Sequence, residues 1–283
     1  MDIIDIHPHI ISDNYDRYPT APLFGKRSAW SQERPFPVES LITEMNQAGV
    51  AKAAVVHSST TYGFDNTYVL DGCRQYPDRL VAVGSVDMLA PDAATEIESL
   101  AKKGLAGLRI FTGGSTKKID PNDLDDPRSF AAWEAAERLS LPVCIQTGQI
   151  GLPKVASLAK RFPRANIILD HMAAPDLLDG PPYVNASSLF SLAQHPNVFL
   201  KLTPRTFGDI RKGNASPETF FPRLVEAFGS QRLAWGSNTP ATPGGLPEIL
   251  AVAKAGVACL SNDDQAWIFS RTAFLLYPDL SKL

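Results

Sequence analysis

The feature that most restricts the fold is a repeat of short apolar segments, each followed by a polar turn and a helix-like stretch. Eight such segments occur, at residues 1–10, 53–57, 80–86, 107–111, 142–146, 166–171, 198–202 and 233–237. Apolar strands that alternate with amphipathic helices are typical of a parallel sheet with both faces covered. Eight such units in ~250 residues match the size of a (β/α)8 barrel.

The helices expected between these strands follow from apolar residues spaced three and four apart and from residues that end helices, such as Gly49. We predict helices at residues 38–49, 66–76, 92–103, 129–139, 153–161, up to 189, and 217–228, with two closing helices at 246–254 and 263–275. No linker interrupts the pattern. The sequence therefore predicts one domain over residues 1–283, a TIM-type barrel with a C-terminal helical extension. A doubly wound sheet usually has a glycine-rich phosphate turn after its first strand, whereas this chain has His-Pro-His there.

Composition excludes several classes of partner. The chain has a net charge of -3 and no run of basic residues, so we expect no binding to nucleic acid. No secretory leader and no apolar run long enough for a membrane span are visible. Three widely spaced cysteines argue against a disulfide framework and favour a cytoplasmic protein. Whether the chain forms a homo-oligomer stays open.

The first strand runs into His7-Pro8-His9. Residues two apart share a face of a strand, so both imidazoles can point to one place beyond the strand's end. Two convergent imidazoles suit a divalent metal, or a cluster that polarises a carbonyl group without one. The long segment 11–37 that follows contains several aromatic residues, and we expect it to form a lid or wall of the same site.

In a parallel barrel the active site lies at the carboxyl ends of the strands. The residues predicted at those ends are His7, His9, His57, Arg109, Gln146, His171, Lys201 and Asn238. Four of the five histidines in the chain are in this set. Such clustering indicates a catalytic cleft.

Five motifs, in order along the chain, resemble the amidohydrolase superfamily, in its branch that contains small lactonases. The motifs are Asp5-Ile6-His7-Pro8-His9, Gly63-Phe64-Asp65-Asn66, Gly107-Leu108-Arg109, Leu169-Asp170-His171-Met172 with Pro175-Asp176, and Trp235-Gly236-Ser237-Asn238 with Pro240. The resemblance implies a barrel enzyme that hydrolyses small substrates. It specifies the superfamily much better than the substrate.

The chain departs from this family at the end of the eighth strand. Relatives commonly have an aspartate there, which ligates a metal and acts as general base, and this chain has Asn238. The fifth strand offers Gln146 where many relatives have a metal ligand, and Arg109 replaces the lysine of two-metal centres. The resemblance then implies one divalent metal, zinc or manganese, on His7, His9 and His171, or a site that works without metal.

The expected roles follow from charge. Arg109, Gln146 and Lys201 would bind an anionic substrate, with Tyr62 and Asn66 as further substrate contacts. Since Asn238 is no base, proton removal would fall to His57, to His171, or to metal-bound hydroxide directly. Structural alternatives also exist, in which Arg109 pairs with Asp87 or Asp170, Lys201 pairs with Asp170, and His57 only bonds nearby backbone. We expect Asp170 to be structural and Arg205 to lie on the loop surface.

Three functions are compatible with these residues. The leading hypothesis is a hydrolase that opens a small carboxylated cyclic ester, or acts on a related carbonyl compound. The second is non-oxidative decarboxylation of an unsaturated or aromatic acid, which a branch of the same superfamily carries out. The third is a non-catalytic binding barrel that has lost its aspartate base.

Overall fold

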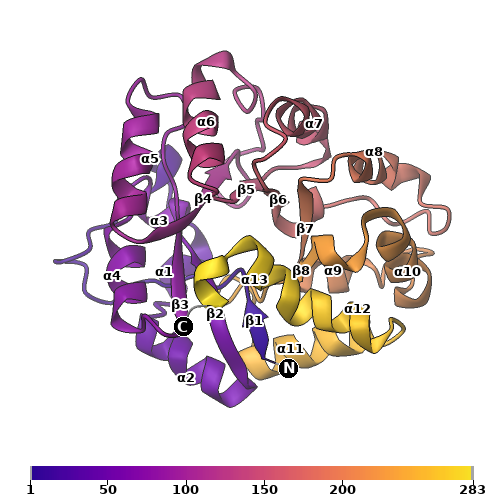
Figure 1. The fold of residues 1–283 in the computed structure, drawn as a ribbon. Coiled ribbons are helices and arrows are strands. Elements are labelled where there is room, and N and C mark those ends of the chain that lie inside the picture. Colours follow the sequence, from indigo (N-terminus) through magenta and orange to yellow (C-terminus); the bar gives the residue numbers. More distant parts are fainter. Residues whose placement is uncertain (1, 282–283) are drawn as a thin grey trace.

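The computed structural model describes residues 2–281, and its centre is a ring of parallel strands (Figure 1). The strands are β1 (Ile3–Asp5), β2 (Val50–Val56), β3 (Leu80–Gly84), β4 (Leu105–Phe111), β5 (Val143–Gln146), β6 (Ile167–Leu169), β7 (Val198–Leu202) and β8 (Leu233–Trp235). Each pairs in parallel with the next along the chain. Ile6 N donates to Trp235 O (3.2 Å), which brings the first strand beside the last. The predicted (β/α)8 barrel is confirmed.

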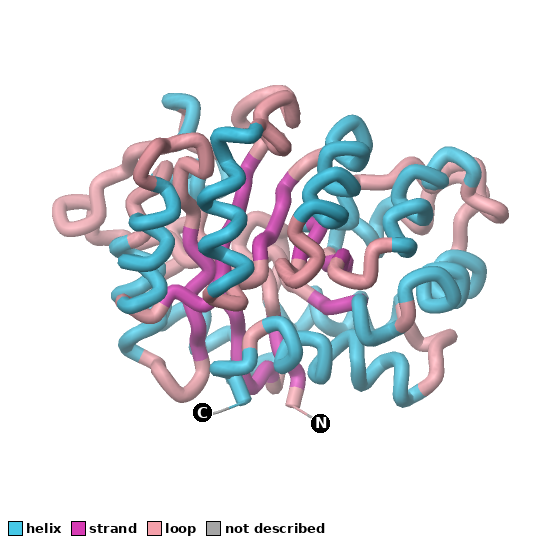
Figure 2. The backbone as a smooth tube through the Cα atoms, turned by 45° about the horizontal axis from the view of Figure 1, so that its top comes forward, coloured by secondary structure: helices cyan, strands magenta, loops and turns pink. Residues whose placement is uncertain are grey.

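Helices surround the strands and cover their outer face (Figure 2). The helices that follow strands are α4 (Thr67–Gln75), α5 (Ala93–Lys102), α6 (Phe130–Arg138), α7 (Leu152–Arg161), α8 (Ser187–Ser191), α10 (Pro217–Phe228) and α11 (Leu246–Gly256), and α2 (Val38–Ala48) precedes β2. Gly49 ends α2 with a φ of 69°, a left-handed conformation that glycine adopts without strain. In residues 2–281, no helix is long and apolar enough to cross a membrane.

The C-terminal extension lies across the amino end of the barrel. It contains α12 (Asn262–Ala266), a π-helical turn (Trp267–Arg271) and α13 (Thr272–Leu276), where the sequence predicts one continuous helix. Its residues Ala273, Leu276, Tyr277 and Leu280 pack in one cluster with the inward-facing apolar side chains of the strands. The extension thus closes the barrel at the end opposite to the predicted site.

Side chains inside the barrel change character along β6 and β7. The inward positions near the amino end are apolar, as at Ile168 in β6 and Phe199 in β7. Two residues later the same face carries Asp170 and Lys201, both fully buried. The barrel interior therefore has an apolar half at the amino end and an ionic half at the carboxyl end, and the site lies above the ionic half.

Candidate active site

A pocket of about 420 Å³ opens at the carboxyl ends of the strands. Five of the predicted site residues line it: His9, Arg109, Gln146, His171 and Asn238. Seven further residues complete the wall: Trp30, Thr60, Phe111, Gly114, Ser115, Arg205 and Ala241. Trp30 comes from α1 (Ala29–Glu33), so the segment expected to form a lid does contribute to the wall.

Three imidazoles from distant parts of the chain meet at this pocket. The ring of His7 lies 5.0 Å from that of His9 and 5.0 Å from that of His171, measured between centroids. The backbone of β8 makes room for them, since a Cβ on Gly236 would lie 2.5 Å from the Cβ of His7. A side chain at position 236 would therefore displace the first imidazole.

His9 is held in one orientation by its neighbours. Its Nδ1 lies 2.7 Å from the carbonyl oxygen of Val56, and the ring stacks on Trp30 at 5.4 Å. A carbonyl oxygen only accepts hydrogen bonds, so Nδ1 carries the proton and Nε2 keeps a free lone pair.

His171 reaches the pocket through an unusual backbone turn. Ile168 and Asp170 face into the barrel, so in a regular strand residue 171 would face outward. Instead the four residues from His171 to Ala174 have φ values of 53–55°, a left-handed conformation that costs energy outside glycine. The turn redirects the imidazole, whose Nδ1 lies 2.7 Å from Thr203 Oγ1. Backbone strain of this kind is concentrated at functional sites.

A buried ionic network supports the imidazoles from below. Lys201 Nζ lies 2.8 Å from Asp170 Oδ1, and Arg109 Nε donates to Asp170 Oδ2 at 3.0 Å. Burial alone would raise the pKa of Asp170, but the charges of Lys201 and Arg109 hold that pKa well below its usual range. The carboxylate is therefore ionised, and it orients both cations.

Lys201 also determines which nitrogen of His7 carries the proton. Lys201 Nζ lies 2.8 Å from His7 Nδ1, and an ammonium group only donates hydrogen bonds. His7 Nδ1 also lies 3.4 Å from Asp170 Oδ1, but the Lys201 contact is the shorter of the two, so we assign Nδ1 as the acceptor and place the proton of the neutral ring on Nε2. That nitrogen is buried and has no hydrogen-bond partner among residues 2–281. His7 thus offers an unsatisfied N–H donor beside the pocket.

The imidazoles are neutral near pH 7 because they are buried. Burial lowers the pKa of His9 to about 3 and that of His171 to about 4. It also lowers the pKa of His7 well below the ordinary value, an effect that the charge of Lys201 increases. Neutral rings can donate and accept hydrogen bonds, and each can take up one proton during a reaction.

The residues present do not fit the predicted metal site. A metal ligand needs a free lone pair, and the contact with Lys201 places a proton on the Nε2 of His7. Two cations, Lys201 and Arg109, share the single carboxylate of Asp170, and Asn238 adds no negative charge. The excess of positive charge disfavours a further cation. Within the described part of the chain, no three His, Cys, Asp or Glu side chains are arranged to hold a metal ion.

Besides His7, four predicted site residues do not line the pocket. His57 follows the inward-facing Val56, so it faces the helices, and its Nε2 donates to Gly63 O at 2.9 Å. Tyr62 Oη accepts from Ser12 N (2.8 Å). Asn66 exchanges two hydrogen bonds, each 2.8 Å, with the backbone of Ser85. These three residues fix loops around the site, and Lys201 lies beneath it.

Sequence reasoning missed the contribution of Arg205. This residue lines the pocket from the start of α9 (Pro204–Asp209), directly after β7, although we expected it on the loop surface. Thr203-Pro204 was the available signal, because a capping threonine followed by proline is typical of a helix start. A helix beginning there places the next side chain over the strand end.

Comparisons with known proteins support the barrel fold and a hydrolytic activity. The chain is 30% identical over 213 residues to L-fucono-1,5-lactonase of Burkholderia ambifaria, covering 73% of this chain and 71% of the relative. It is 24% identical to 2-pyrone-4,6-dicarboxylate hydrolase of Comamonas testosteroni, covering 84% and 76% of the two chains. A zinc-bound amidohydrolase structure from Burkholderia multivorans superposes with a TM-score of 0.77 at 20% identity, covering 98% of this chain and 99% of the other.

The family model described as amidohydrolase matches residues 4–278, almost the whole chain. The matched residues include β2 to β8, all of β1 except Ile3, and the imidazoles of His7, His9 and His171. This protein is an enzyme of the hydrolase type and belongs to the amidohydrolase family.

Proposed function

We propose that this enzyme hydrolyses a small lactone that carries a carboxylate. The observation that carries the proposal is the pairing, in one pocket, of two guanidinium groups with imidazoles that burial keeps neutral. Lactone hydrolysis needs a hydrogen-bond donor for the carbonyl oxygen and a group that takes a proton from water. A carboxylate on the substrate explains why the pocket contains Arg109 and Arg205.

Arg109 is the proposed anchor for the substrate carboxylate. Asp170 engages only its Nε, and its terminal nitrogens form no hydrogen bond to any residue between 2 and 281. These nitrogens present parallel N–H groups that match the two oxygens of a carboxylate. Arg205, which lines the same pocket, adds a second positive charge, and Gln146 adds an amide donor. Lys201 would act on the substrate only through Asp170 and His7.

His7 is the proposed electrophilic group. Its Nε2–H has no partner and would donate to the lactone carbonyl oxygen, where negative charge develops in the transition state. Lys201 supports this role because its contact with Nδ1 fixes the tautomer. Since the donor is already in place and buried, little reorganisation is needed during the reaction.

His171 is the proposed general base. Asn238 Nδ2 donates to Thr242 Oγ1 at 3.0 Å, which leaves the amide oxygen to orient a water molecule. The water oxygen bonds to the carbonyl carbon while its proton passes to Nε2 of His171. The ring C–O bond then breaks, and the alkoxide leaving group takes that proton. His9, whose Nε2 lone pair is free, would hold the same water.

We further propose that no metal takes part, since the tautomer of His7 and the excess of cations disfavour one. The substrate would be a small anion rather than a nucleic acid. A cytoplasmic location is consistent with Cys73, Cys144 and Cys259, all of which are unpaired.

A panel of matched lactones tests the function. Each pair has the same ring with and without a carboxylate, and release of acid and of carbon dioxide is measured. We expect acid release only, with kcat/KM at least tenfold higher for the carboxylated member. Release of carbon dioxide would support the decarboxylase instead. Binding without turnover of any member, by folded protein, would support the non-catalytic barrel.

A further inference from the structure

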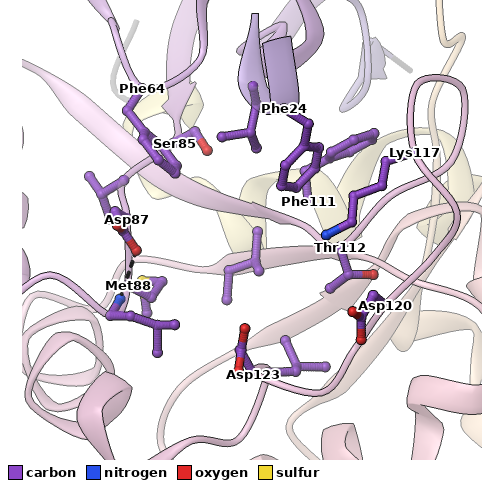
Figure 3. A pocket seen from close by; sticks show the side chains of 15 residues that line it. Phe24, Phe64, Ser85, Asp87, Met88, Phe111, Thr112, Lys117, Asp120 and Asp123 are labelled. Carbon is purple, nitrogen blue, oxygen red and sulfur yellow. Dashed lines mark hydrogen bonds between the residues drawn. The ribbon is translucent and has the colours of Figure 1, made fainter. Parts of the chain in front are cut away.

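A second cavity, of about 180 Å³, lies beside the active-site pocket on the same rim of the barrel. Its walls are the 3-10 turn η1 (Leu23–Gly25), the segment after β3, and the loop that follows β4. Phe111 is the one residue that lines both cavities. Figure 3 shows Phe111 beside Phe24 and Lys117, with Met88 across the cavity from them. No part of the proposed hydrolytic mechanism uses this space.

The cavity has the size and lining for one aromatic ring. Phe24, Phe64 and Phe111 form aromatic walls, and the buried side chains of Met88 and Leu124 contribute further apolar surface. An apolar cavity of about 150 Å³ is large enough to bind benzene. This volume therefore accommodates a six-membered ring with a short chain.

The edge of the cavity carries unbalanced negative charge. Asp87, Asp120 and Asp123 line it and are exposed, and within residues 2–281 none of them forms an ion pair. Asp87 and Asp120 accept hydrogen bonds only from nearby backbone, at Leu89 N (3.0 Å) and Asn122 N (3.1 Å). The one basic residue of the lining is Lys117. A ligand with a positive head group would complement this edge.

Lys117 itself shows how a cation lies in this cavity. Its ammonium group lies 4.4 Å from the centre of the Phe24 ring, within the range of a cation–π interaction. In Figure 3 the side chain of Lys117 reaches along Phe24 and Phe111 toward the interior of the cavity. A ligand ammonium would find the same aromatic faces and, in addition, carboxylates without ionic partners.

We propose that this cavity is a second binding site, for a small aromatic ammonium ion. The ring lies between the phenylalanines and the ammonium group faces Asp87, Asp120 and Asp123. The active-site pocket has the opposite preference, because Arg109 and Arg205 repel a cation and attract a carboxylate. A ligand bound here would also affect the hydrolytic site, because Phe111 lines both cavities. The Arg109 guanidinium lies 5.2 Å from the centre of the Phe111 ring.

The probe is 2-phenylethylamine, compared with 2-phenylethanol, which has a similar shape and no charge. Protein with ¹³C-methyl methionine reports the location, because Met88 lines the cavity and Met45 lies away from it in α2. We expect the amine to shift the Met88 methyl resonance, leave that of Met45 in place, and bind about tenfold more tightly than the alcohol. No shift at Met88, or equal affinity for both probes, would overturn the proposal.

Substitutions of acidic and of basic residues at the edge of the cavity should change the affinity for the amine in opposite directions. Asp120→Asn with Asp123→Asn should weaken amine binding at least threefold and leave alcohol binding unchanged. Lys117→Gln should strengthen amine binding, because it removes a competing cation from Phe24. The control is Asp78→Asn, an exposed carboxylate in the turn before β3, at the other end of that strand. If the control weakened binding as much as the double variant, net charge rather than this site would account for the affinity.

Discussion

The two halves of the barrel interior differ in how their buried side chains are stabilised. At the amino end, Ile168 and Phe199 pack against the other inward-facing apolar residues and the C-terminal extension. At the carboxyl end, the same faces of β6 and β7 carry Asp170 and Lys201, which are as deeply buried but form an ion pair. Apolar packing tolerates exchange of one side chain for another of similar size, whereas a buried ion depends on its particular partner.

The comparison shows how one scaffold supports both stability and chemistry. The apolar half closes the barrel, and the ionic half fixes Arg109 and the tautomer of His7 for the pocket above it. Cys144 lies at the boundary, because its Sγ contacts Lys201 Nζ at 3.3 Å and Tyr277 Oη at 3.6 Å. We therefore expect substitutions in the two halves to have separable effects.

The largest effect is expected from Asp170→Asn. The change leaves Lys201 and Arg109 without their shared carboxylate, and breaking a buried ion pair costs about 3–5 kcal/mol. Denaturation in urea should show this loss in the free energy of unfolding, together with loss of activity. The matched change in the apolar half is Phe199→Leu, expected to cost less than about 1.5 kcal/mol. Equal costs for both variants would contradict the distinction between the halves.

Arg205→Ala tests the pocket without touching the buried network. Arg205 is half exposed, and within residues 2–281 its one ion pair is with Asp209 (3.4 Å), so stability should change little. Loss of one charged contact to the substrate should raise KM for a carboxylated lactone about tenfold, with kcat nearly unchanged. Steady-state kinetics on both members of a matched lactone pair measure this. The exposed Arg211→Ala is the control, and an equal rise in KM for the uncharged lactone would argue against carboxylate recognition.

Asn238→Asp restores the residue that relatives commonly have after the eighth strand. A carboxylate next to His171 would share the task of general base. Because His171 already serves in the proposed mechanism, we expect only about a tenfold increase in kcat. Single-turnover kinetics separate this change from product release. No change in rate would mean that proton removal does not limit the reaction.

The remaining predictions concern pH. The ordinary pKa of histidine is 6.5, and burial lowers it to about 3 for His9 and about 4 for His57 and His171. Below pH 6.5 the unfolded chain takes up protons that the folded protein does not. The free energy of unfolding therefore has its full value above pH 6.5 and decreases as the pH falls from 6.5 towards 4.

The rate should behave differently over the same interval. The imidazoles of the folded protein stay neutral, so kcat should be nearly constant between pH 8 and 5 and fall only near pH 4. A pH–rate profile measured together with the free energy of unfolding checks both statements. Loss of kcat around pH 6.5 in fully folded protein would show that the reacting imidazole is not buried in the way described.

Much of the barrel was predictable because strands and helices follow local periodicity. Gly49 ends α2 as expected, and the apolar runs lie in the expected strands. The strand ends also indicated where His7, His9 and His171 would meet. That residues 1–283 form a single domain stays a prediction.

The sequence predicted where the site residues lie along the strands, but not the direction in which their side chains point. His57 and His9 both follow apolar runs. Because Val56 faces into the barrel, His57 faces outward and hydrogen-bonds to Gly63. His171 required a left-handed turn that no local pattern indicates, since Met172, Ala173 and Ala174 rarely adopt it. The proton position on His7 depends on Lys201, 194 residues away in sequence.

The most direct test of the account is hydrolysis of a carboxylated lactone by protein treated with a chelator, with metal content measured on the same sample. We predict full activity at far less than one metal ion per chain, because Lys201 keeps the proton of His7 on the nitrogen that a metal would need. Activity that disappears on chelation and returns in proportion to added zinc or manganese would contradict the account.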